Sequence, residues 1–378
     1  MMRVGLNLIF LVPGETGGME TVARELIPRL AALPGVELIA LVNSETAEDT
    51  EEAAPWRKLC AMEVVPVHAR NRVEWVRGEQ QHVPRLAKAL GVDIVHSLAS
   101  TAPAWGPFKR VTTIHDLHYK VVPDAHFGLR GLGMRVLVPL AARSSHRILA
   151  VSEATKRDLV KHLRTPAGKI DVVPNGVSLP GDVVATPAPE LRVRLGLGNR
   201  RVLLSVSAKR PHKNLARLLD AVASIPAERR PLLVLPGYST PHEDELREHA
   251  SALGVSADVV MPAWVSPADL EGLYAVADAF VFPSLYEGFG LPLLEAMARG
   301  VPVATSNRAS LPEVAGNAAL AFDPEDTGAM RAAIERLLND EAAARRLRKA
   351  GYERVRAFSW KHSAELTVAA YRRVLSDA

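Results

Sequence analysis

Two glutamates eight residues apart carry the strongest chemical signal in this sequence. Glu287 lies in a glycine-bearing segment, and Glu295 lies in a stretch with the apolar spacing of a helix that stops at Gly300. The residues before them, 279–282, are apolar and predict a buried strand. Because side chains on a helix lean toward its N-terminus, we expect Glu295 to point toward the loop that carries Glu287.

A loop and helix of this kind form a site for an anion that also carries hydroxyl groups. The backbone N–H groups of Phe289, Gly290 and Leu291 and the positive end of the helix would hold phosphate oxygens. Ionised carboxylates accept hydrogen bonds from hydroxyl groups, so a nucleotide-sugar diphosphate fits both features. The alternative is a solvated surface glutamate followed by an ordinary capped helix, and two glutamates at this spacing alone would favour that alternative.

The residues around the two glutamates make the interpretation specific. The segment Pro283-Ser-Leu-Tyr-Glu-Gly-Phe-Gly-Leu-Pro-Leu-Leu-Glu-Ala-Met-Ala-Arg-Gly300 resembles the E-x7-E signature of retaining glycosyltransferases of family 4. The resemblance implies that Glu295 accepts hydrogen bonds from the ribose hydroxyls. It also implies that Glu287 contacts the transferred sugar and stabilises positive charge at the anomeric carbon. With this frame intact we favour the functional interpretation.

The same resemblance implies an α/β architecture, the GT-B fold, with two Rossmann-like parallel-sheet domains facing each other across a cleft. The last helix would cross back to the N-terminal domain. Short apolar segments alternate with helical patterns along the chain, which also favours parallel sheets covered by helices. We expect an N-terminal acceptor domain in residues 1–180 with the helix 361–378, and a nucleotide-sugar donor domain in residues 190–358. The expected strands cover residues 3–12, 36–42, 62–66, 93–96, 111–114, 147–151, 170–173, 201–207, 231–235, 259–261, 278–282, 301–304 and 319–322.

A basic loop follows the first expected strand of the second domain. Lys213 closes the segment Lys209-Arg-Pro-His-Lys-Asn-Leu215, and its ammonium would offset the growing negative charge of the leaving diphosphate. Many relatives carry an arginine five residues before this lysine, but this chain has Ala208 there. Lys209 or Arg210 would then supply the second cation. The alternative is a basic loop that is simply solvated.

The other candidate residues lie in three loops. Gly17 and Gly18 resemble the GGxE loop of the family after the first strand, and would bring backbone amides to the donor phosphate. His115 resembles a family histidine that hydrogen-bonds the donor sugar, with Asp116 as its supporting partner. Trp264 lies where the family lines the base pocket, although a core or rim tryptophan explains it equally well.

Composition limits the remaining classes of function. The chain has 378 residues, of which 48% are hydrophobic and 23% charged, with a net charge of +4, so we expect a globular protein without nucleic acid as a partner. Cys60 is the single cysteine, which excludes an intrachain disulfide and favours a reducing, cytoplasmic location. The twelve histidines lack ligand spacing and no DxD-like pair is present, so we expect no metal and no cofactor.

A peripheral contact with the inner face of the membrane is a further hypothesis. Residues 70–77 and 129–143 mix arginines with apolar side chains, including Trp75, Met134 and Leu137. The alternative is that these segments are amphipathic helices packed on the sheet of the first domain.

The sequence therefore predicts a retaining, metal-independent glycosyltransferase that moves a sugar from a nucleotide-diphosphate donor to a hydroxyl of a glycan or lipid-linked acceptor. The form of the basic loop and the His-Asp-Leu segment resemble mannosyltransferases of polysaccharide assembly, so GDP-mannose is the first expected donor. UDP- and dTDP-sugars remain alternatives. A non-catalytic nucleotide-sugar binding module is a further alternative. A phosphorylase would need a longer chain, and a dinucleotide dehydrogenase would need a G-x-G-x-x-G after the first strand.

Overall fold

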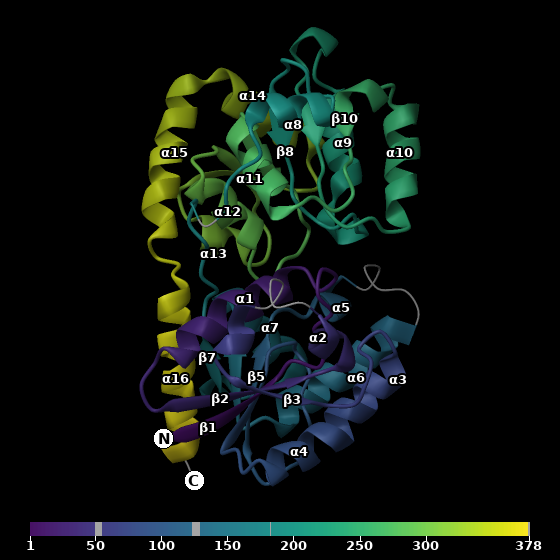
Figure 1. Cartoon of the computed structure of the whole chain (residues 1–378). Helices are drawn as coiled ribbons and strands as arrows, with labels where there is room; N and C mark the ends of the chain where they lie inside the picture. The colour runs from purple at the N-terminus through teal and green to yellow at the C-terminus, as the bar shows by residue number, and fades with distance from the viewer. Residues whose placement is uncertain (50–54, 123–128, 182, 377–378) are drawn as a thin grey trace. The chain divides into compact units, whose positions relative to one another are not determined.

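The computed structural model describes residues 1–49, 55–122, 129–181 and 183–376, with the side chains of 129–132 left out. The chain divides into two compact units, each with its own parallel sheet. The first comprises Met1–Lys120, His126–Gly176 and Phe358–Ala378, and the second comprises Val121–Ala125 and Val177–Ala357. Figure 1 labels many of the elements of each unit.

The first unit contains a seven-stranded parallel sheet in the order β3-β2-β1-β4-β5-β6-β7. Its strands are β1 (Met2–Asn7), β2 (Val36–Val42), β3 (Ala61–Val64), β4 (Ile94–Ser97), β5 (Lys109–Ile114), β6 (Arg147–Ala150) and β7 (Ile170–Val172). The order reverses between β1 and β4, because β1 pairs with both β2 and β4. This reversal is the point where ligands bind in open α/β sheets, at the carboxyl ends of the strands.

The first strand is shorter than the sequence predicts. The apolar run reaches Val12, but β1 ends at Asn7, and the chain then turns so that the N–H of Leu11 donates to the carbonyl of Leu8. Leu8 and Ile9 are still fully buried. The apolar run therefore predicted burial correctly, but it did not predict where the strand ends.

Helices cover this sheet. They are α1 (Gly18–Ala31), α2 (Ser44–Glu48), α3 (Arg72–Arg77), α4 (Val83–Ala89), α5 (His118–Val121), α6 (Leu129–Ser144), α7 (Glu153–Leu163) and α16 (Trp360–Ser376), with short turns η1 (Pro55–Lys58), η2 (Gly78–His82) and η4 (Ala167–Lys169). The last helix, α16, packs against α1, β5 and β6. The preceding helix, α15, covers residues 341–355 and belongs to the second unit, whereas α16 belongs to the first. The expected return of the chain to the first domain is therefore confirmed.

The second unit contains a six-stranded parallel sheet in the order β10-β9-β8-β11-β12-β13. Its strands are β8 (Val202–Leu204), β9 (Leu232–Val234), β10 (Val259–Val260), β11 (Ala279–Phe282), β12 (Val303–Ser306) and β13 (Ala319–Phe322). Its helices are α8 (Ala188–Arg194), α9 (Leu215–Ala223), α10 (His242–Ala252), α11 (Pro267–Val276), α12 (Leu291–Ala298), α13 (Leu311–Ala315), α14 (Thr327–Asn339) and α15 (Glu341–Val355), with turns η5 (Pro211–Lys213), η6 (Ala227–Arg229) and η7 (Ser256–Asp258).

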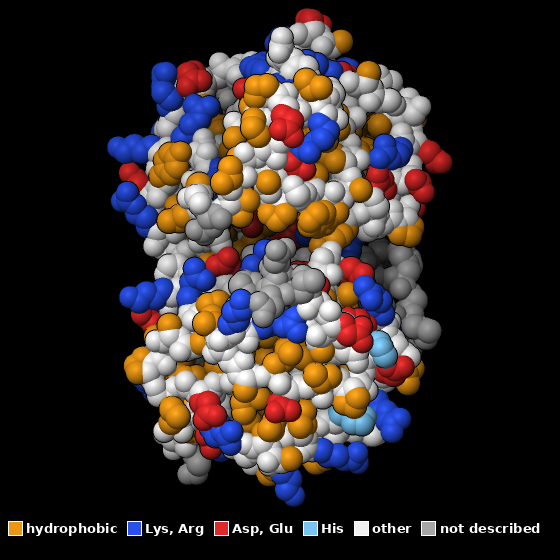
Figure 2. Space-filling view, in the orientation of Figure 1, with side chains coloured by type: hydrophobic (Ala, Val, Ile, Leu, Met, Phe, Trp, Pro, Cys, Tyr) orange, Lys and Arg blue, Asp and Glu red, His pale blue; other side chains and the backbone are white. Residues whose placement is uncertain are grey.

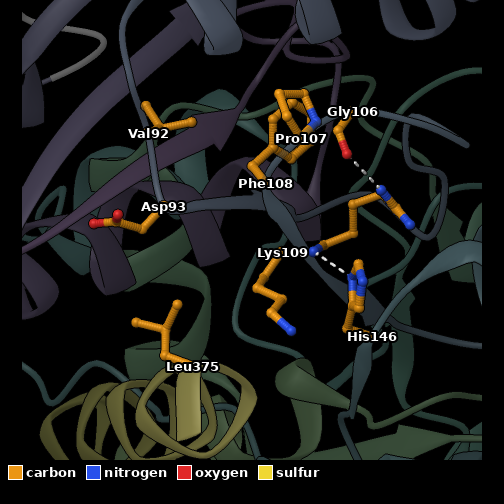
Figure 3. A pocket seen from close by; sticks show the side chains of 9 residues that line it. Val92, Asp93, Gly106, Pro107, Phe108, Lys109, His146 and Leu375 are labelled. Carbon is orange, nitrogen blue, oxygen red and sulfur yellow. Dashed lines mark hydrogen bonds between the residues drawn. The ribbon is translucent and has the colours of Figure 1, made fainter. Parts of the chain in front are cut away.

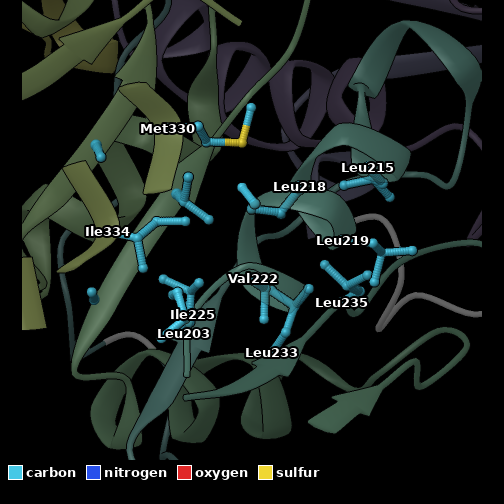
Figure 4. Close-up of a cluster of buried hydrophobic side chains, with 14 of the residues drawn as sticks. Leu203, Leu215, Leu218, Leu219, Val222, Ile225, Leu233, Leu235, Met330 and Ile334 are labelled. Carbon is cyan, nitrogen blue, oxygen red and sulfur yellow. The ribbon is translucent and has the colours of Figure 1, made fainter. Parts of the chain in front are cut away.

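One apolar cluster holds α9 and α14 against this second sheet. Leu218 and Val222 of α9 meet Ile334 of α14, and all three are buried (Figure 4). The strands add Leu203 and Leu233, both without exposed surface. Burying a leucine side chain contributes roughly 1.5–3 kcal/mol, so this layer fixes the strands whose ends carry the candidate site.

The apolar residues proposed for a membrane contact lie mostly inside the first unit. Trp75 belongs to a buried cluster, and Leu137 packs against that cluster, while Met134 packs against a second one. These side chains therefore support helix packing rather than a membrane surface. No helix in the described residues is long and apolar enough to cross a membrane. On the described part of the face that Figure 2 shows, Lys and Arg are interspersed with Asp and Glu over each unit.

Candidate functional site

The loops that follow β8 and β11 meet because these strands are neighbours in a parallel sheet. Phe280 of β11 pairs with Leu204 of β8, and both strands end at the same edge. β8 leads through η5 into α9, and β11 leads through residues 283–290 into α12. The order of strands reverses between β8 and β11, so this edge is the expected ligand site of the second sheet.

An ion pair joins the two loops. The Lys213 ammonium donates to Glu287 Oε1 at 2.6 Å, and the side chains are only 16% and 14% exposed. The same ammonium lies 5.8 Å from the centre of the Phe282 ring. The sequence placed both residues in one site, and the structure brings them into direct contact.

Two polar side chains and one backbone hydrogen bond fix this pair in place. The Asn214 side-chain amide donates to the carbonyls of Pro283 (3.1 Å) and Pro324 (2.7 Å), and the N–H of Leu285 donates to the carbonyl of His212. From the loop after β12, the buried Ser310 hydroxyl lies 2.9 Å from the carbonyl oxygens of Glu287 and Phe289. These contacts hold the Glu287 loop from both neighbouring strands.

The turn into α12 requires glycine. Gly290 has φ of +107°, and a Cβ there would lie 2.8 Å from Leu311 Cδ2. The N–H groups of Gly290 and Leu291 make no hydrogen bond within the described residues. They are two donors at the positive end of a helix, where an anion binds favourably.

Glu295 lies on the first turns of the same helix and is partly exposed. Its Oε2 accepts a hydrogen bond from the Tyr274 hydroxyl at 2.9 Å. Burial raises the pKa of Glu295 above its usual range, whereas Arg299 and the hydrogen bond from Tyr274 oppose that rise. The hydroxyl therefore orients the carboxylate and favours its ionised form.

Arg299 supports this arrangement from the end of α12. It forms an ion pair with Glu271, its Nη1 donates to the carbonyl of Glu295 at 3.1 Å, and its guanidinium lies 5.0 Å from the centre of the Tyr274 ring. The cation is thus shared between the ring that orients Glu295 and a neighbouring carboxylate.

The structure excludes Lys209 as a phosphate cation. Its side chain has no exposed surface, and its ammonium donates to the carbonyls of Gly237 (2.9 Å) and Pro262 (3.0 Å) beside the Glu243 carboxylate at 3.4 Å. A buried ammonium that is fully occupied in this way ties three segments together. The side chain of Arg210, in contrast, is half-buried and forms no hydrogen bond or ion pair within the described part of the chain.

Trp264 lies in the loop after β10 and is 55% exposed. It is therefore a surface tryptophan and not a core residue, which leaves the interpretation of a pocket rim open. Its neighbour Ala263 accepts a hydrogen bond from the N–H of Gly237, so the loop is anchored to the segment after β9.

In the first unit, the glycine loop leads directly into α1. Gly17 has φ of +63° and ψ of −134°, a combination that side-chain-bearing residues avoid, and Gly18 is exposed. The Glu20 carboxylate accepts the N–H of Gly14 at 3.0 Å, which closes the loop. The N–H groups of Gly17 and Gly18 make no hydrogen bond within the described residues.

His115 follows β5 at the carboxyl edge of the first sheet. Its Nε2 lies 2.6 Å from the carbonyl of Leu98, so Nε2 carries the proton and donates, and its backbone N–H donates to the Ser100 hydroxyl. Burial lowers the pKa of His115, although the bond to Leu98 opposes the shift. The ring is therefore neutral near pH 7, with Nδ1 as an acceptor.

Asp116 and His118 form their own pair next to this ring. The Asp116 carboxylate contacts His118 Nδ1 and accepts the N–H of His118 at 3.1 Å. Burial would raise the pKa of Asp116, but the charge and hydrogen bonds of His118 outweigh it and hold the pKa below its usual range. Asp116 thus pairs directly with His118, while its effect on His115 is electrostatic.

A buried polar cluster at this edge was not anticipated. Glu79, 2% exposed, accepts hydrogen bonds from Asn7 Nδ2 (3.2 Å) and the Thr101 hydroxyl (2.8 Å), and Asn7 also donates to the Ser97 hydroxyl. Burial raises the pKa of Glu79 to about 7. Asn7 and Ser97 end β1 and β4, so the cluster lies where the strand order reverses.

Among residues 1–49, 55–122, 129–181 and 183–376, no three His, Cys, Asp or Glu side chains are grouped so that they could hold a metal ion. The candidate site of the second unit has Lys213 and two open backbone N–H groups as its positive elements.

Comparison with known proteins covers both units. Residues 188–354 match the family model described as glycosyl transferases group 1, and residues 16–179 match the model described as glycosyltransferase family 4. The chain is 34% identical over 269 residues to O-antigen chain mannosyltransferase B of Escherichia coli, which covers 70% of each protein.

A second relative is much longer than this chain. The serotype-specific mannosyltransferase WbdA of Escherichia coli is 28% identical over 282 residues, which are 72% of this chain but 34% of WbdA. Among solved structures, sucrose-phosphate synthase from Thermosynechococcus elongatus matches with a TM-score of 0.79 and 22% identity over all of both chains.

Proposed function

Because the chain belongs to glycosyltransferase family 4 and has its GT-B fold, we propose that it transfers mannose from GDP-mannose to a hydroxyl group of a glycan or lipid-linked acceptor. We further propose that the anomeric configuration is retained and that no metal ion is required. Glycosyl transfer itself follows from membership of the family. The donor, the stereochemistry and the residue roles are the proposed parts.

The donor site is assigned to the carboxyl edge of the β8–β13 sheet. The observation that carries this assignment is the contact of Lys213 with Glu287 beside the open N–H groups of Gly290 and Leu291. The oxygens of a diphosphate would accept hydrogen bonds from the Lys213 ammonium and from these N–H groups. Glu295, oriented by Tyr274, would then accept hydrogen bonds from the ribose hydroxyls.

Lys213 and Glu287 would act on opposite charges as the reaction proceeds. The bond between the anomeric carbon and the β-phosphate oxygen breaks, and a bond to the acceptor oxygen forms on the same face of the sugar. The acceptor proton passes to the leaving phosphate, which yields a nucleoside diphosphate and the glycoside. Lys213 would stabilise the growing negative charge, and Glu287 the positive charge of the sugar.

His115 would bind the transferred sugar as a hydrogen-bond acceptor. Its Nε2–H is used by Leu98, so the lone pair of Nδ1 remains for a sugar hydroxyl. This requires a neutral ring, which the lowered pKa of His115 provides. Arg210 is proposed as the second phosphate cation, since Lys209 is occupied by carbonyls. Gly17 and Gly18 would add backbone amides.

Two relatives named as mannosyltransferases support mannose as the transferred sugar. The contacts proposed for Glu295 and Lys213 are with the ribose and the phosphates, which all nucleotide sugars share. These contacts therefore favour no particular base. UDP- and dTDP-sugars are therefore the alternative donors. Trp264, 55% exposed at the end of β10, is the proposed aromatic partner of the base.

The test is a calorimetric titration of the whole chain with GDP, UDP, dTDP and ADP, first with a chelator and then with magnesium. We expect GDP to bind in the presence of the chelator, and Glu295→Ala or Lys213→Ala to weaken the binding. Binding of a different nucleotide would reassign the donor, and binding only with magnesium would contradict a metal-free site. Binding of no nucleotide would contradict a nucleotide-sugar donor site in the free protein.

A peripheral membrane contact is a separate proposal with a narrower basis. Val73 (78%), Val136 (60%) and Leu140 (37%) are exposed apolar side chains within the two suggested segments. Trp75 and Leu137 of the same segments pack inward. Flotation with vesicles that contain acidic lipid tests the contact. A chain that stays with the unbound fraction would rule it out.

A further inference from the structure

A cavity at the amino edge of the first sheet lies apart from every residue assigned to the donor site. It has a volume of about 420 Å³ and is lined by residues before β4, at the start of β5, before β6 and at the end of α16. His115 follows the other end of β5, and six strand residues at about 3.3 Å each separate the two ends by roughly 20 Å. Ligands of open α/β sheets bind at the carboxyl edge, so this cavity is not the usual site.

Basic side chains dominate the polar lining. Among the described residues, Lys109, Arg110 and His146 line the cavity together with one carboxylate, that of Asp93. Asp93 Oδ2 already accepts the backbone N–H of Arg3 at 2.8 Å. Figure 3 shows the Lys109 side chain extending into the space between Leu375 and His146.

The imidazole of His146 is held in a defined orientation. The backbone N–H of Arg110 donates to His146 Nδ1 at 2.9 Å, and the N–H of His146 donates to the carbonyl of Arg110. Because Nδ1 accepts, the proton of the neutral ring is on Nε2. Within the described residues, neither Nε2 of His146 nor the Lys109 ammonium forms a hydrogen bond or an ion pair.

The other cations are fixed by backbone carbonyls. The Arg110 guanidinium donates to the carbonyls of Ser144 (2.9 Å) and Gly106 (3.2 Å), and the Lys169 ammonium donates to those of Ala142 and Arg143. These bonds satisfy donors but leave the positive charges unneutralised. Burial, together with the charges of Arg110, Lys109 and Lys169, lowers the pKa of His146 to about 4.

We propose that this cavity binds a phosphate group, held by the Lys109 ammonium and the Nε2–H of His146 in the positive field of Arg110 and Lys169. The group is either free phosphate or the phosphate of a small monoester, whose organic part would lie against the apolar lining of the cavity. Leu375 and Phe108 form that lining. The site is distinct from the donor diphosphate site and independent of it.

The His146 ring provides a local reporter. Its signals in a proton–nitrogen NMR spectrum are assigned by their loss in His146→Gln, and inorganic phosphate is titrated at pH 7. We expect a saturable shift of these signals, and an increase in the pKa of His146 when phosphate is bound, because an anion favours the imidazolium. The charged groups that act on this titration are Lys109 and Arg110 of β5 and Lys169 of η4, and Asp93 is a further charged group in the lining of the cavity.

Three variants separate this site from others. Lys109→Ala, with Lys109→Gln as a second version, should weaken the response about tenfold, since a charge-assisted hydrogen bond is lost. Lys349→Ala, an exposed lysine of the second unit, should leave it unchanged, and so should Lys213→Ala at the donor site. A response lost in Lys213→Ala would mean that the phosphate binds at the donor site, and would overturn the proposal.

Glucose 6-phosphate distinguishes the two sources of the group. Tighter binding than inorganic phosphate at the His146 signals assigns the site to a monoester, and equal or weaker binding assigns it to free phosphate. An unchanged His146 spectrum with both compounds, or an equal response in Lys109→Ala and the unchanged chain, contradicts a phosphate site.

Discussion

At the carboxyl edge of the second sheet, acidic groups have charged or hydroxyl partners. Glu287 contacts Lys213, and Glu295 accepts the Tyr274 hydroxyl beside Arg299. At the carboxyl edge of the first sheet, the buried Glu79 has only neutral partners. Both edges lie where the strand order reverses, so the same topology carries two kinds of polar site.

The difference teaches which ligand each edge can stabilise. A site with an ammonium and open N–H groups favours a diphosphate, whose charge must be balanced. At the edge of the first sheet, Glu79, whose pKa of about 7 leaves it partly protonated near neutral pH, and the His115 ring offer the hydrogen bonds that hydroxyl groups can form. The comparison therefore favours the proposal that the second unit balances the charge of the donor and that the first recognises hydroxyl groups.

The largest expected effect is the loss of the Lys213 ammonium. In Lys213→Ala, the rate of sugar transfer should fall by about a thousandfold, because mutations that remove one group stabilising transition-state charge cost roughly 10²–10³ in rate. Steady-state release of GDP from GDP-mannose measures it. Lys349→Ala, at an exposed position, is the matched control. A transfer rate in Lys213→Ala within tenfold of that of the unchanged chain would contradict the proposed role of the Lys213 ammonium in the mechanism.

The second prediction concerns the neutral edge of the first sheet. The pKa of Glu79 is raised from 4.5 to about 7, so the folded state binds its proton more tightly than the unfolded state does. Stability from this group is present below about pH 4.5 and is lost as the pH rises through about 7, by about 3 kcal/mol at most.

Glu79→Gln should remove this dependence. The urea midpoint of the first unit's unfolding, compared at pH 5 and pH 8, should change less in Glu79→Gln than in the unchanged chain. Glu353→Gln, at an exposed position, is the control and should keep the original dependence. An identical pH dependence in Glu79→Gln would show that the carboxyl is ionised in the folded protein and that the first edge is not neutral.

A smaller effect is expected at Glu295. Glu295→Gln keeps an oxygen for the Tyr274 hydroxyl but loses the charge that strengthens bonds from the ribose. We expect about tenfold weaker binding of GDP by calorimetry, and a smaller loss for 2′-deoxy-GDP, because that ligand lacks one of the hydroxyls. An equal loss for both ligands would place the ribose elsewhere.

The smallest effect should come from Tyr274, which acts through Glu295. Tyr274→Phe removes the hydroxyl that favours the ionised carboxylate, so the pKa of Glu295 should rise further. GDP binding should then weaken a few-fold at pH 7, with a larger loss at pH 6. Tyr352→Phe, with an exposed ring, is the control, and a loss that does not vary with pH would make Tyr274 a structural residue only.

The sequence predicted the sheets well because buried parallel strands are continuous apolar runs. All thirteen expected strands are present, and the errors are at their ends: the first was expected to run to Val12 but ends at Asn7. In the sequence, Asn7 is one polar residue in an apolar run. In the fold, its side-chain amide donates a hydrogen bond to Glu79, which is 72 residues away in the sequence. Such a pair leaves no local pattern.

The candidate site was predictable as far as local segments define it. The loop signatures placed Lys213, Glu287 and Glu295 together, but burial of Lys209 depends on carbonyls of Gly237 and Pro262 in two distant loops. For the same reason the supporting residues were missed. Tyr274, for example, belongs to another element and carries no motif of its own, although it contacts Glu295.

Hydrogen exchange tests the central claim most directly, because it reports where a nucleotide binds. The whole chain is followed by mass spectrometry with and without saturating GDP, or with the tightest-binding nucleotide of the calorimetric panel. The account predicts slower exchange in peptides that cover residues 208–215 and 284–300, and no such slowing in these peptides for Lys213→Ala. Protection that omits both segments, or that persists in Lys213→Ala, would contradict a donor site at the edge formed by β8 and β11.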